Sequence, residues 1–107
     1  MIALQDFKKV EMKVGKILSV EDHPNADKLV VMRVDLGEGQ PRTLVAGLKP
    51  YYAKADLVGK LIVVVTNLDP ARLRGVESRG MLLAAQHADS VVVLTLDKPI
   101  PPGSPVL

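Results

Sequence analysis

The sequence predicts an all-β fold, a five-stranded Greek-key barrel with one short helix and an extended C-terminal arm. Three observations predict it. Short runs rich in β-branched residues recur along the chain between Gly, Pro, Asn and Asp, the first run is much longer than the others, and a single segment has helical character. The 107 residues, 48% hydrophobic and 24% charged, are expected to form one domain, residues 1–107.

The first run, residues 10–20, predicts a long strand with a bulge. Its apolar residues alternate as far as Val14, and a change of phase at Gly15 lets Ile17 face the core. A glycine inside a strand is typical of such an irregularity, because an extra residue can be inserted there without a side-chain clash. We therefore expect the bulge at the glycine.

Two further strands are expected to complete a meander with the first. After a loop at residues 23–27, apolar and polar residues alternate over residues 29–36, and a shorter apolar run covers residues 43–46. The glycine-rich residues 37–41 between them are typical of a hairpin connection.

The second half of the chain supplies the helix and the last strands. Residues 50–58 predict a short helix, with a proline near its start and a glycine just beyond its end. Residues 61–66 form a continuous β-branched run of the kind buried on both faces of a sheet, and residues 81–85 are interpreted in the same way. Residues 91–96 follow a polar turn and close the set.

This set of elements matches a barrel of the oligonucleotide-binding (OB-fold) type, which has five strands and a helix between the third and fourth. Residues 97–107 contain four prolines and cannot form a regular central strand. They form either a disordered tail or an extended arm of the barrel. Such an arm would cover an open barrel edge or contact a partner subunit.

No motif in the chain predicts catalysis, a metal or a cofactor. The sequence has no cysteine, and His23 and His87 stand alone in turn segments, where we expect them at the surface. We therefore predict a protein that is not an enzyme and holds neither metal nor cofactor. The longest apolar run is five residues, against about 20 for a membrane span. Without a signal-peptide pattern, the expected location is the cytoplasm.

Basic residues are clustered although the formal net charge is only +2. Four lysines lie between residues 8 and 16, and Arg72, Arg74 and Arg79 fall within eight residues. Such clusters are either a solvated face or a surface for a nucleic acid.

The segment of residues 67–85 contains the strongest candidates for binding. It is interpreted as a loop in which Arg72 and Arg74, two residues apart in an extended segment, place both guanidinium groups on one face. Guanidinium groups bind phosphate oxygens in a bidentate manner. The Ser78 hydroxyl and nearby backbone amides can add uncharged contacts to phosphate or ribose. Met81 is either a core residue or a contact, and Asn67 either a turn residue or a contact.

Aromatic residues make up only 3% of the chain, so a stacking platform for single-stranded bases is not expected. A folded RNA recognised through its backbone and shape fits this composition better.

Five ordered blocks resemble the tRNA-binding domain found at the C-terminus of many methionyl-tRNA synthetases and as free-standing bacterial proteins. Related domains occur in the cytokine-like endothelial monocyte-activating polypeptide and in CsaA-type export chaperones. In the chaperones other patterns tend to replace VAGL and SRGM, so the chain is more similar to the tRNA binders. The blocks are DFKKVEMKVGKI (6–17), HPNADKL (23–29), RTLVAGL (42–48), NLDPARLRG (67–75) and SRGMLLAA (78–85).

The resemblance implies an OB-fold domain that binds the outer corner of folded tRNA and forms a homodimer through its terminal segments. Ala71 departs from a position that is often basic, and Arg79 stands where a glutamine is common, which suggests that positive charge has moved to Arg79. The contacts expected from the residues and the resemblance together are Lys28, Arg42, Asn67, Arg72, Arg74, Ser78, Arg79 and Met81.

The function expected from the sequence is noncatalytic tRNA binding that assists an aminoacyl-tRNA synthetase, with the methionyl type favoured. The alternative is a CsaA-like peptide-binding chaperone that uses exposed apolar surface. The two differ in salt dependence, because only phosphate binding weakens steeply as salt rises.

Overall fold

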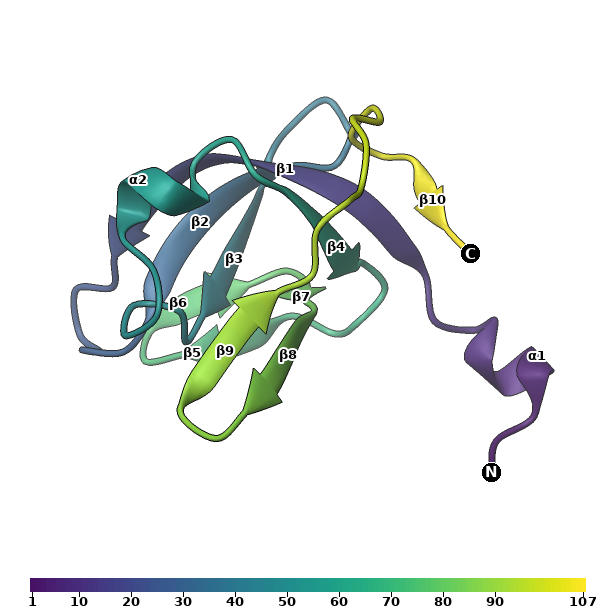
Figure 1. Ribbon diagram of the computed structural model, residues 1–107, viewed down its shortest axis with the longest axis horizontal. Coiled ribbons are helices and arrows are strands. Elements are labelled where there is room, and N and C mark those ends of the chain that lie inside the picture. The colour runs from purple at the N-terminus through teal and green to yellow at the C-terminus, as the bar shows by residue number, and fades with distance from the viewer.

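The computed structural model describes residues 1–107 and shows a nearly closed antiparallel barrel (Figure 1). Its main sheet has the strand order β3-β2-β1-β4-β7, and a further short strand, β10, pairs with β1. The all-β class expected from the sequence is confirmed. The strands of this sheet are β1 (Met12–Asp22), β2 (Val30–Asp35), β3 (Arg42–Ala46), β4 (Leu61–Val65), β7 (Met81–Leu82) and β10 (Pro105–Val106).

The barrel closes between β3 and the chain that enters β7. The amide of Arg79 donates to the carbonyl of Thr43 at 2.9 Å, and the amide of Val45 donates to the Ser78 hydroxyl at 3.0 Å. Closure therefore depends on a small number of polar contacts rather than on a full strand ladder.

β1 is long and bulged as expected, but the bulge lies elsewhere. Its register against β2 shifts between Ile17 and Ser19, whereas its pairing with β4 is regular through Gly15. A Cβ at Gly15 would lie 2.6 Å from a methyl of Val34. The glycine is required by close packing inside the barrel, so the prediction that placed the bulge there is wrong.

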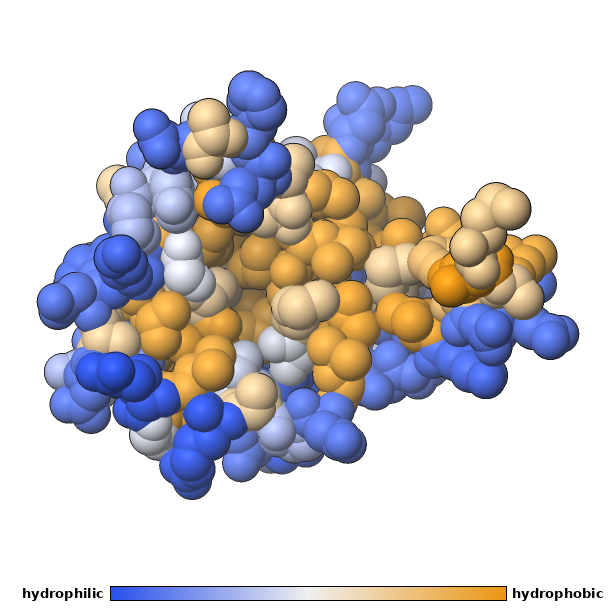
Figure 2. All heavy atoms as spheres, turned by 90° about the horizontal axis from the view of Figure 1, so that it is seen from below, coloured by the Kyte–Doolittle hydropathy of each residue, from blue (hydrophilic) through white to orange (hydrophobic).

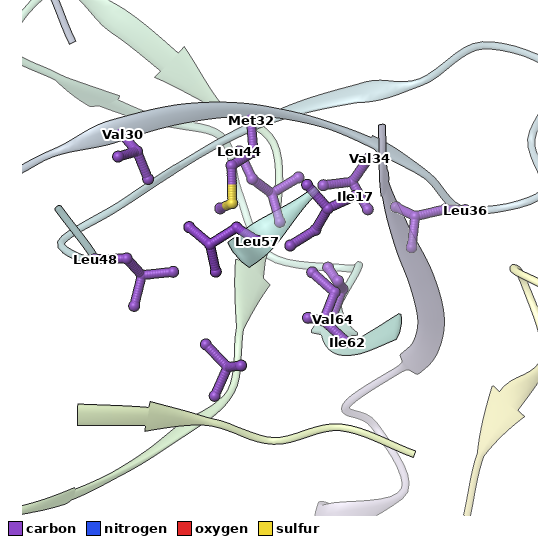
Figure 3. Packing of buried hydrophobic residues seen from close by; sticks show 11 residues of the cluster. Ile17, Val30, Met32, Val34, Leu36, Leu44, Leu48, Leu57, Ile62 and Val64 are labelled. Atoms are coloured by element: carbon purple, nitrogen blue, oxygen red, sulfur yellow. The ribbon is translucent and has the colours of Figure 1, made fainter. Parts of the chain in front are cut away.

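The core fills the barrel between the strands and α2 (Lys54–Leu57), which is shorter than the predicted helix. Figure 3 shows Leu57 of α2 among the side chains of the strands. β4 is buried along both faces, as its β-branched run predicts: Ile62 and Val64 join the core cluster, and Val63 and Val65 are also buried. The other cluster members are Ile17, Val30, Met32, Val34, Leu36, Leu44, Leu48 and Val93.

Residues 67–85 are not the loop that the sequence predicts. They contain a two-stranded hairpin and then β7, and the chain continues into a second hairpin. Residues 81–85 were expected to be buried on both faces, but Met81 is half exposed and Ala84 and Ala85 are exposed. The hairpin strands are β5 (Ala71–Leu73), β6 (Val76–Ser78), β8 (Ala84–His87) and β9 (Ser90–Val93).

The C-terminal residues form a packed arm, not a tail. β10 pairs with Met12 and Lys13 of β1, and the amide of Gly103 donates to the carbonyl of Val14 at 2.7 Å. Before β1, a short helix that the sequence analysis did not predict, α1 (Leu4–Phe7), lies on the same side of the molecule as the arm (Figure 1). Neither of the two helices has the length or the apolar sequence that a membrane span requires.

Candidate nucleic-acid interface

The β5–β6 hairpin turns through two residues with left-handed backbone, Arg74 (φ +53) and Gly75 (φ +94). Positive φ at both central positions is the geometry of a type I′ turn, whose twist matches that of the flanking strands. Arg72 lies in β5, opposite Glu77. The prediction that both arginines lie in one extended segment is therefore wrong, because Arg74 belongs to the turn.

The two arginines differ in what they contact. The Arg72 guanidinium donates to the carbonyl of Gly75 at 2.8 Å, so the side chain folds back across its own turn. Arg74 is exposed and makes no ion pair or side-chain hydrogen bond within the chain. Its guanidinium is free to bind an anion.

Ser78 is buried, with 5% of its surface exposed. Its hydroxyl accepts from the amide of Val45 and donates to the carbonyl of Gly80 at 3.1 Å. The only proton of the hydroxyl is thus used inside the protein. In this structure the side chain closes the barrel and does not face an incoming ligand.

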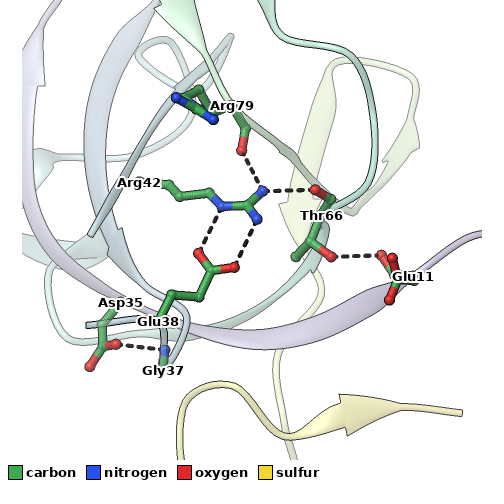
Figure 4. A network of polar contacts seen from close by, with 7 residues as sticks. All are labelled: Glu11, Asp35, Gly37, Glu38, Arg42, Thr66 and Arg79. Carbon is green, nitrogen blue, oxygen red and sulfur yellow. Dashed lines mark hydrogen bonds and ion pairs between the residues drawn. The ribbon is translucent and has the colours of Figure 1, made fainter. Parts of the chain in front are cut away.

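Arg42 lies at the centre of a polar network (Figure 4). Its guanidinium donates to both carboxylate oxygens of Glu38 at 2.8 Å, and also to the carbonyls of Thr66 at 2.7 Å and Arg79 at 3.1 Å. The group therefore joins β3 to the end of β4 and to the chain that enters β7.

The same network changes the acidity of Glu38. The hydrogen bond from Arg42 is the main cause of a lowered pKa of the Glu38 carboxyl. Burial opposes it, and the positive charges of Arg42, Lys13 and Arg79 lower the pKa further. The carboxylate is the favoured form, and the pair holds the end of β3 in place.

Asn67 anchors the chain that precedes β1. Its side-chain oxygen accepts from the amide of Glu11 at 2.9 Å, and its side-chain nitrogen donates to the carbonyl of Lys9 at 2.7 Å. Asn67 is exposed, but both ends of its amide are bonded within the protein. It resembles Arg42 and Ser78 in this respect.

The remaining predicted residues have side chains open to solvent. Lys28 is exposed in the loop between β1 and β2, and Arg79 is exposed beyond β6, with a 3.9 Å ion pair to Glu77. Met81 is 50% exposed, which excludes the interpretation of this residue as a core methionine. With Leu68 it lines a largely apolar pocket of about 200 Å³.

Contacts place the exposed candidates on the β5–β6 hairpin or beside it. β6 runs beside β3, because Ser78 bonds to Val45 and Arg79 bonds to Thr43. The turn end of the hairpin reaches the loop that carries Lys28, through a hydrogen bond between His23 and Leu73. We call this surface, formed by Lys28, Arg72, Arg74, Arg79 and Met81, the hairpin flank.

The predicted exposure of His23 is wrong. It was expected at the surface, yet only 5% of it is exposed. No local signal indicates this, because the segment that covers it lies fifty residues later in the chain. His87 is exposed, as predicted.

The fold and the hairpin flank define the protein as a small antiparallel barrel with exposed guanidinium groups at the β5–β6 hairpin. The chain belongs to the family described as "Putative tRNA binding domain", whose model matches residues 12–105. The resemblance found in the sequence is thereby confirmed.

Methionine–tRNA ligases are among the relatives. The enzyme of Nanoarchaeum equitans is 53% identical over 106 residues, which is 99% of this chain and 14% of that protein. The enzyme of Pyrococcus furiosus is 51% identical over 105 residues, which is 98% of this chain and 14% of that protein. The chain thus spans about 14% of the length of these curated relatives.

Solved structures share the whole fold. A protein from Pyrococcus horikoshii described as related to methionyl-tRNA synthetase aligns with a TM-score of 0.92 and 33% identity, covering 100% of this chain and 98% of that chain. The chaperone CsaA of Bacillus anthracis aligns with a TM-score of 0.89 and 27% identity, covering 100% and 99%.

Proposed function

We propose that this protein is a noncatalytic tRNA-binding module that assists an aminoacyl-tRNA synthetase in the cytoplasm, with methionyl-tRNA synthetase the favoured partner. The observation that carries the proposal is the hairpin flank, where Arg74 is exposed and unpaired at the tip of a well-defined turn. Membership of the family and the relatives named methionine–tRNA ligase support it.

Within this proposal the predicted contact residues have two kinds of role. Lys28, Arg72, Arg74 and Arg79 attract and bind phosphates, and Met81 contributes apolar contact with the RNA surface. Three further residues shape the surface because their polar atoms are bonded within the protein, and they meet RNA at most through their remaining edges: Arg42, Asn67 and Ser78.

The chemistry of the flank favours folded RNA over single strands. None of the residues assigned to it is aromatic, so it offers no surface on which unstacked bases would be sandwiched. Guanidinium and ammonium groups bind the phosphate backbone with little regard for sequence. A module of this kind raises the local tRNA concentration for an attached or associated enzyme, and selection of the tRNA is left to that enzyme.

The direct test is a titration of the protein with folded bulk tRNA and with single-stranded RNA of equal length, at several salt concentrations. We expect tighter binding to folded tRNA and a linear fall of log affinity with log salt, by about 0.7–0.9 for each phosphate neutralised. Binding to neither RNA would contradict the proposal. Salt-insensitive binding of an unfolded peptide would then favour a chaperone function, for which the similarity to CsaA is the supporting observation.

A single substitution tests the assignment of Arg74. Arg74→Asn removes the charge, and asparagine tolerates the left-handed backbone of the turn. We expect the slope of log affinity against log salt to decrease by about one phosphate contact. The matched control is Lys98→Ala, which also removes an exposed positive charge. Lys98 lies outside the hairpin flank, three residues after Thr95, whose hydroxyl donates to the carbonyl of Leu61 at the start of β4 at 2.7 Å. Equal effects of the two variants would refute the site.

We also propose that the protein forms a homodimer through its terminal segments. α1 and β10 line an apolar groove of about 390 Å³. Large hydrophobic side chains of this lining are exposed to solvent, among them Leu4, Phe7 and Leu107. Figure 2 shows apolar atoms gathered at the terminal end of the molecule. The occupant that fits this groove is the same segment of a second copy, since the contact would be self-complementary. The residues that line the groove are Leu4, Phe7, Lys8, Val10, Met12, Val106 and Leu107.

A further inference from the structure

His23 joins two segments that are far apart in the sequence. Its Nε2 atom lies 2.9 Å from the carbonyl oxygen of Leu73 in β5, and its Nδ1 atom lies 2.9 Å from the amide nitrogen of Asn25. The ring is almost completely buried between the β1–β2 loop and the hairpin.

The two partners determine the form of the imidazole. The amide of Asn25 can only donate, so Nδ1 accepts and carries no proton. The carbonyl of Leu73 can only accept, so Nε2 carries the proton and donates it. His23 is therefore a neutral ring in one tautomer, with both nitrogen atoms bonded.

The hairpin has few other hydrogen bonds to the barrel. The three residue pairs of β5 and β6 link these strands only to each other, and the bonds of Ser78 and Arg79 to β3 lie at the end away from the turn. At the turn end, the hydrogen bond from His23 is the one that ties β5 to the barrel. A two-stranded hairpin alone is only marginally stable in water.

The carbonyl of Leu73 that His23 binds lies next to Arg74, the residue proposed to bind phosphate. Leu73 pairs with Val76 and directly precedes Arg74, the first residue of the turn. Fixing the Leu73 carbonyl therefore fixes the direction in which the turn projects, and with it the guanidinium of Arg74. An unfixed hairpin would have to be ordered when RNA binds, at a cost in conformational entropy.

We propose that His23 is a positioning residue for tRNA binding: it holds the β5–β6 hairpin against the β1–β2 loop so that Arg72 and Arg74 face the RNA without rearrangement. The inference rests on the proposed tRNA function and adds to it a residue that does not touch the RNA. It also explains why an imidazole is buried beside the turn end of a surface hairpin.

Two amide side chains of different length separate the two hydrogen bonds of His23. In His23→Gln the side-chain amide reaches the position of Nε2 and can donate to Leu73, whereas in His23→Asn the shorter amide replaces Nδ1 and leaves Leu73 without a donor. We expect His23→Asn to weaken tRNA binding about five- to tenfold, as for the loss of one hydrogen bond, and His23→Gln to restore most of the affinity. Thermal unfolding of both variants checks that they are folded.

A double-mutant cycle with Arg74→Asn distinguishes positioning from a general structural role. In the parent protein Arg74→Asn lowers the salt slope by about one contact, and in the His23→Asn background we expect little further change, because the guanidinium is no longer held in place. A variant that merely lowers the folded fraction would leave the effect of Arg74→Asn intact. That result, or unchanged affinity in His23→Asn, would overturn the proposal.

Hydrogen exchange provides a readout without RNA. We expect faster exchange of the hairpin amides, Val76 above all, in His23→Asn but not in His23→Gln.

If the parent protein fails to bind tRNA, the proposed function fails and the positioning role for tRNA fails with it. Faster exchange in that case would still show that His23 fixes the hairpin. Unchanged exchange would refute the role of His23 even if tRNA binds.

Discussion

Single polar side chains decide how the hairpin flank is built. Residue types that bind phosphate in other settings, such as Arg42 and Ser78, are here bonded across the barrel closure. Arg74 has no partner within the chain and is the residue that we propose for the ligand. Residue type therefore predicts that this region is polar, and the bonding pattern separates the side chains bonded within the protein from those open to solvent.

Removing the Ser78 hydroxyl should destabilise the barrel. In Ser78→Ala the buried amide of Val45 loses its acceptor, which costs about 1–3 kcal/mol in the free energy of unfolding. Urea denaturation measures this loss of unfolding free energy. Ser90→Ala, at an exposed position, serves as the control and should change stability by less than about 0.5 kcal/mol. An equally stable Ser78→Ala would show that closure does not depend on this contact.

The pair of Glu38 and Arg42 predicts a pH dependence. The pKa of Glu38 is lowered from its ordinary value of 4.5, so its stabilising effect is complete above that pH and is lost as pH falls through the lowered pKa. Glu38→Gln should be less stable than the parent by about 1 kcal/mol at pH 7, because the pair is partly exposed.

The difference between Glu38→Gln and its parent should shrink as pH falls below about 4.5, as measured by urea denaturation at each pH. Glu21→Gln is the matched control, since Glu21 is exposed and forms no ion pair. A difference in unfolding free energy that stays constant down to pH 3 would contradict the assignment of the pair.

The burial of individual polar residues could not be predicted from the sequence. His23 and Leu73 are fifty residues apart, and Ser78 and Val45 are thirty-three apart. Neither pairing leaves a periodic signal, because each depends on where the hairpin packs against the barrel.

At the scale of elements, β-branched runs were predicted well and the other apolar runs poorly. β4 was identified because its β-branched run is typical of a strand buried on both faces, whereas the apolar residues 81–85 are largely exposed. The β5–β6 hairpin was missed because its turn is Arg-Gly instead of the usual Asn-Gly or Asp-Gly, and because β5 is fully exposed. β10 was missed because its pairing is only two residues long.

The close packing inside the barrel, where β1 lies between β2 and β4, predicts a sensitive position at Gly15. In Gly15→Ala the new methyl would lie 2.6 Å from Val34 and 3.1 Å from Leu36, so the core must shift at a cost of about 1–3 kcal/mol. Chemical denaturation measures the loss. Gly47→Ala is the control, because its nearest contact would be an ordinary 3.9 Å. Similar stability of the two variants would contradict the packing at Gly15.

At the scale of the molecule, the barrel class followed from the order of the elements. The alternatives for residues 97–107 were a tail or an arm, and the structure shows an arm hydrogen-bonded to β1. Association of two copies through the terminal groove remains a prediction, since it depends on a surface that a single chain leaves open.

Phe7→Asp tests the dimer. A carboxylate in the apolar groove of α1 and β10 should prevent association, so sedimentation equilibrium should give the mass of one 11.5 kDa chain instead of two. The control is Val92→Asp, which places the same charge at an exposed apolar residue on β9 and should leave the dimer intact. A parent protein that sediments as a monomer at micromolar concentration would refute the dimer.

The groove between α1 and β10 has one more consequence. Leu4 and Leu107 both line it, so the first and last turns of the chain lie on the same side of the barrel (Figure 1). The β5–β6 hairpin lies on the other side of the view. A protein fused to either terminus would therefore start from the side away from the β5–β6 hairpin, and N-terminal and C-terminal fusions should be interchangeable without covering the surface that we propose for tRNA.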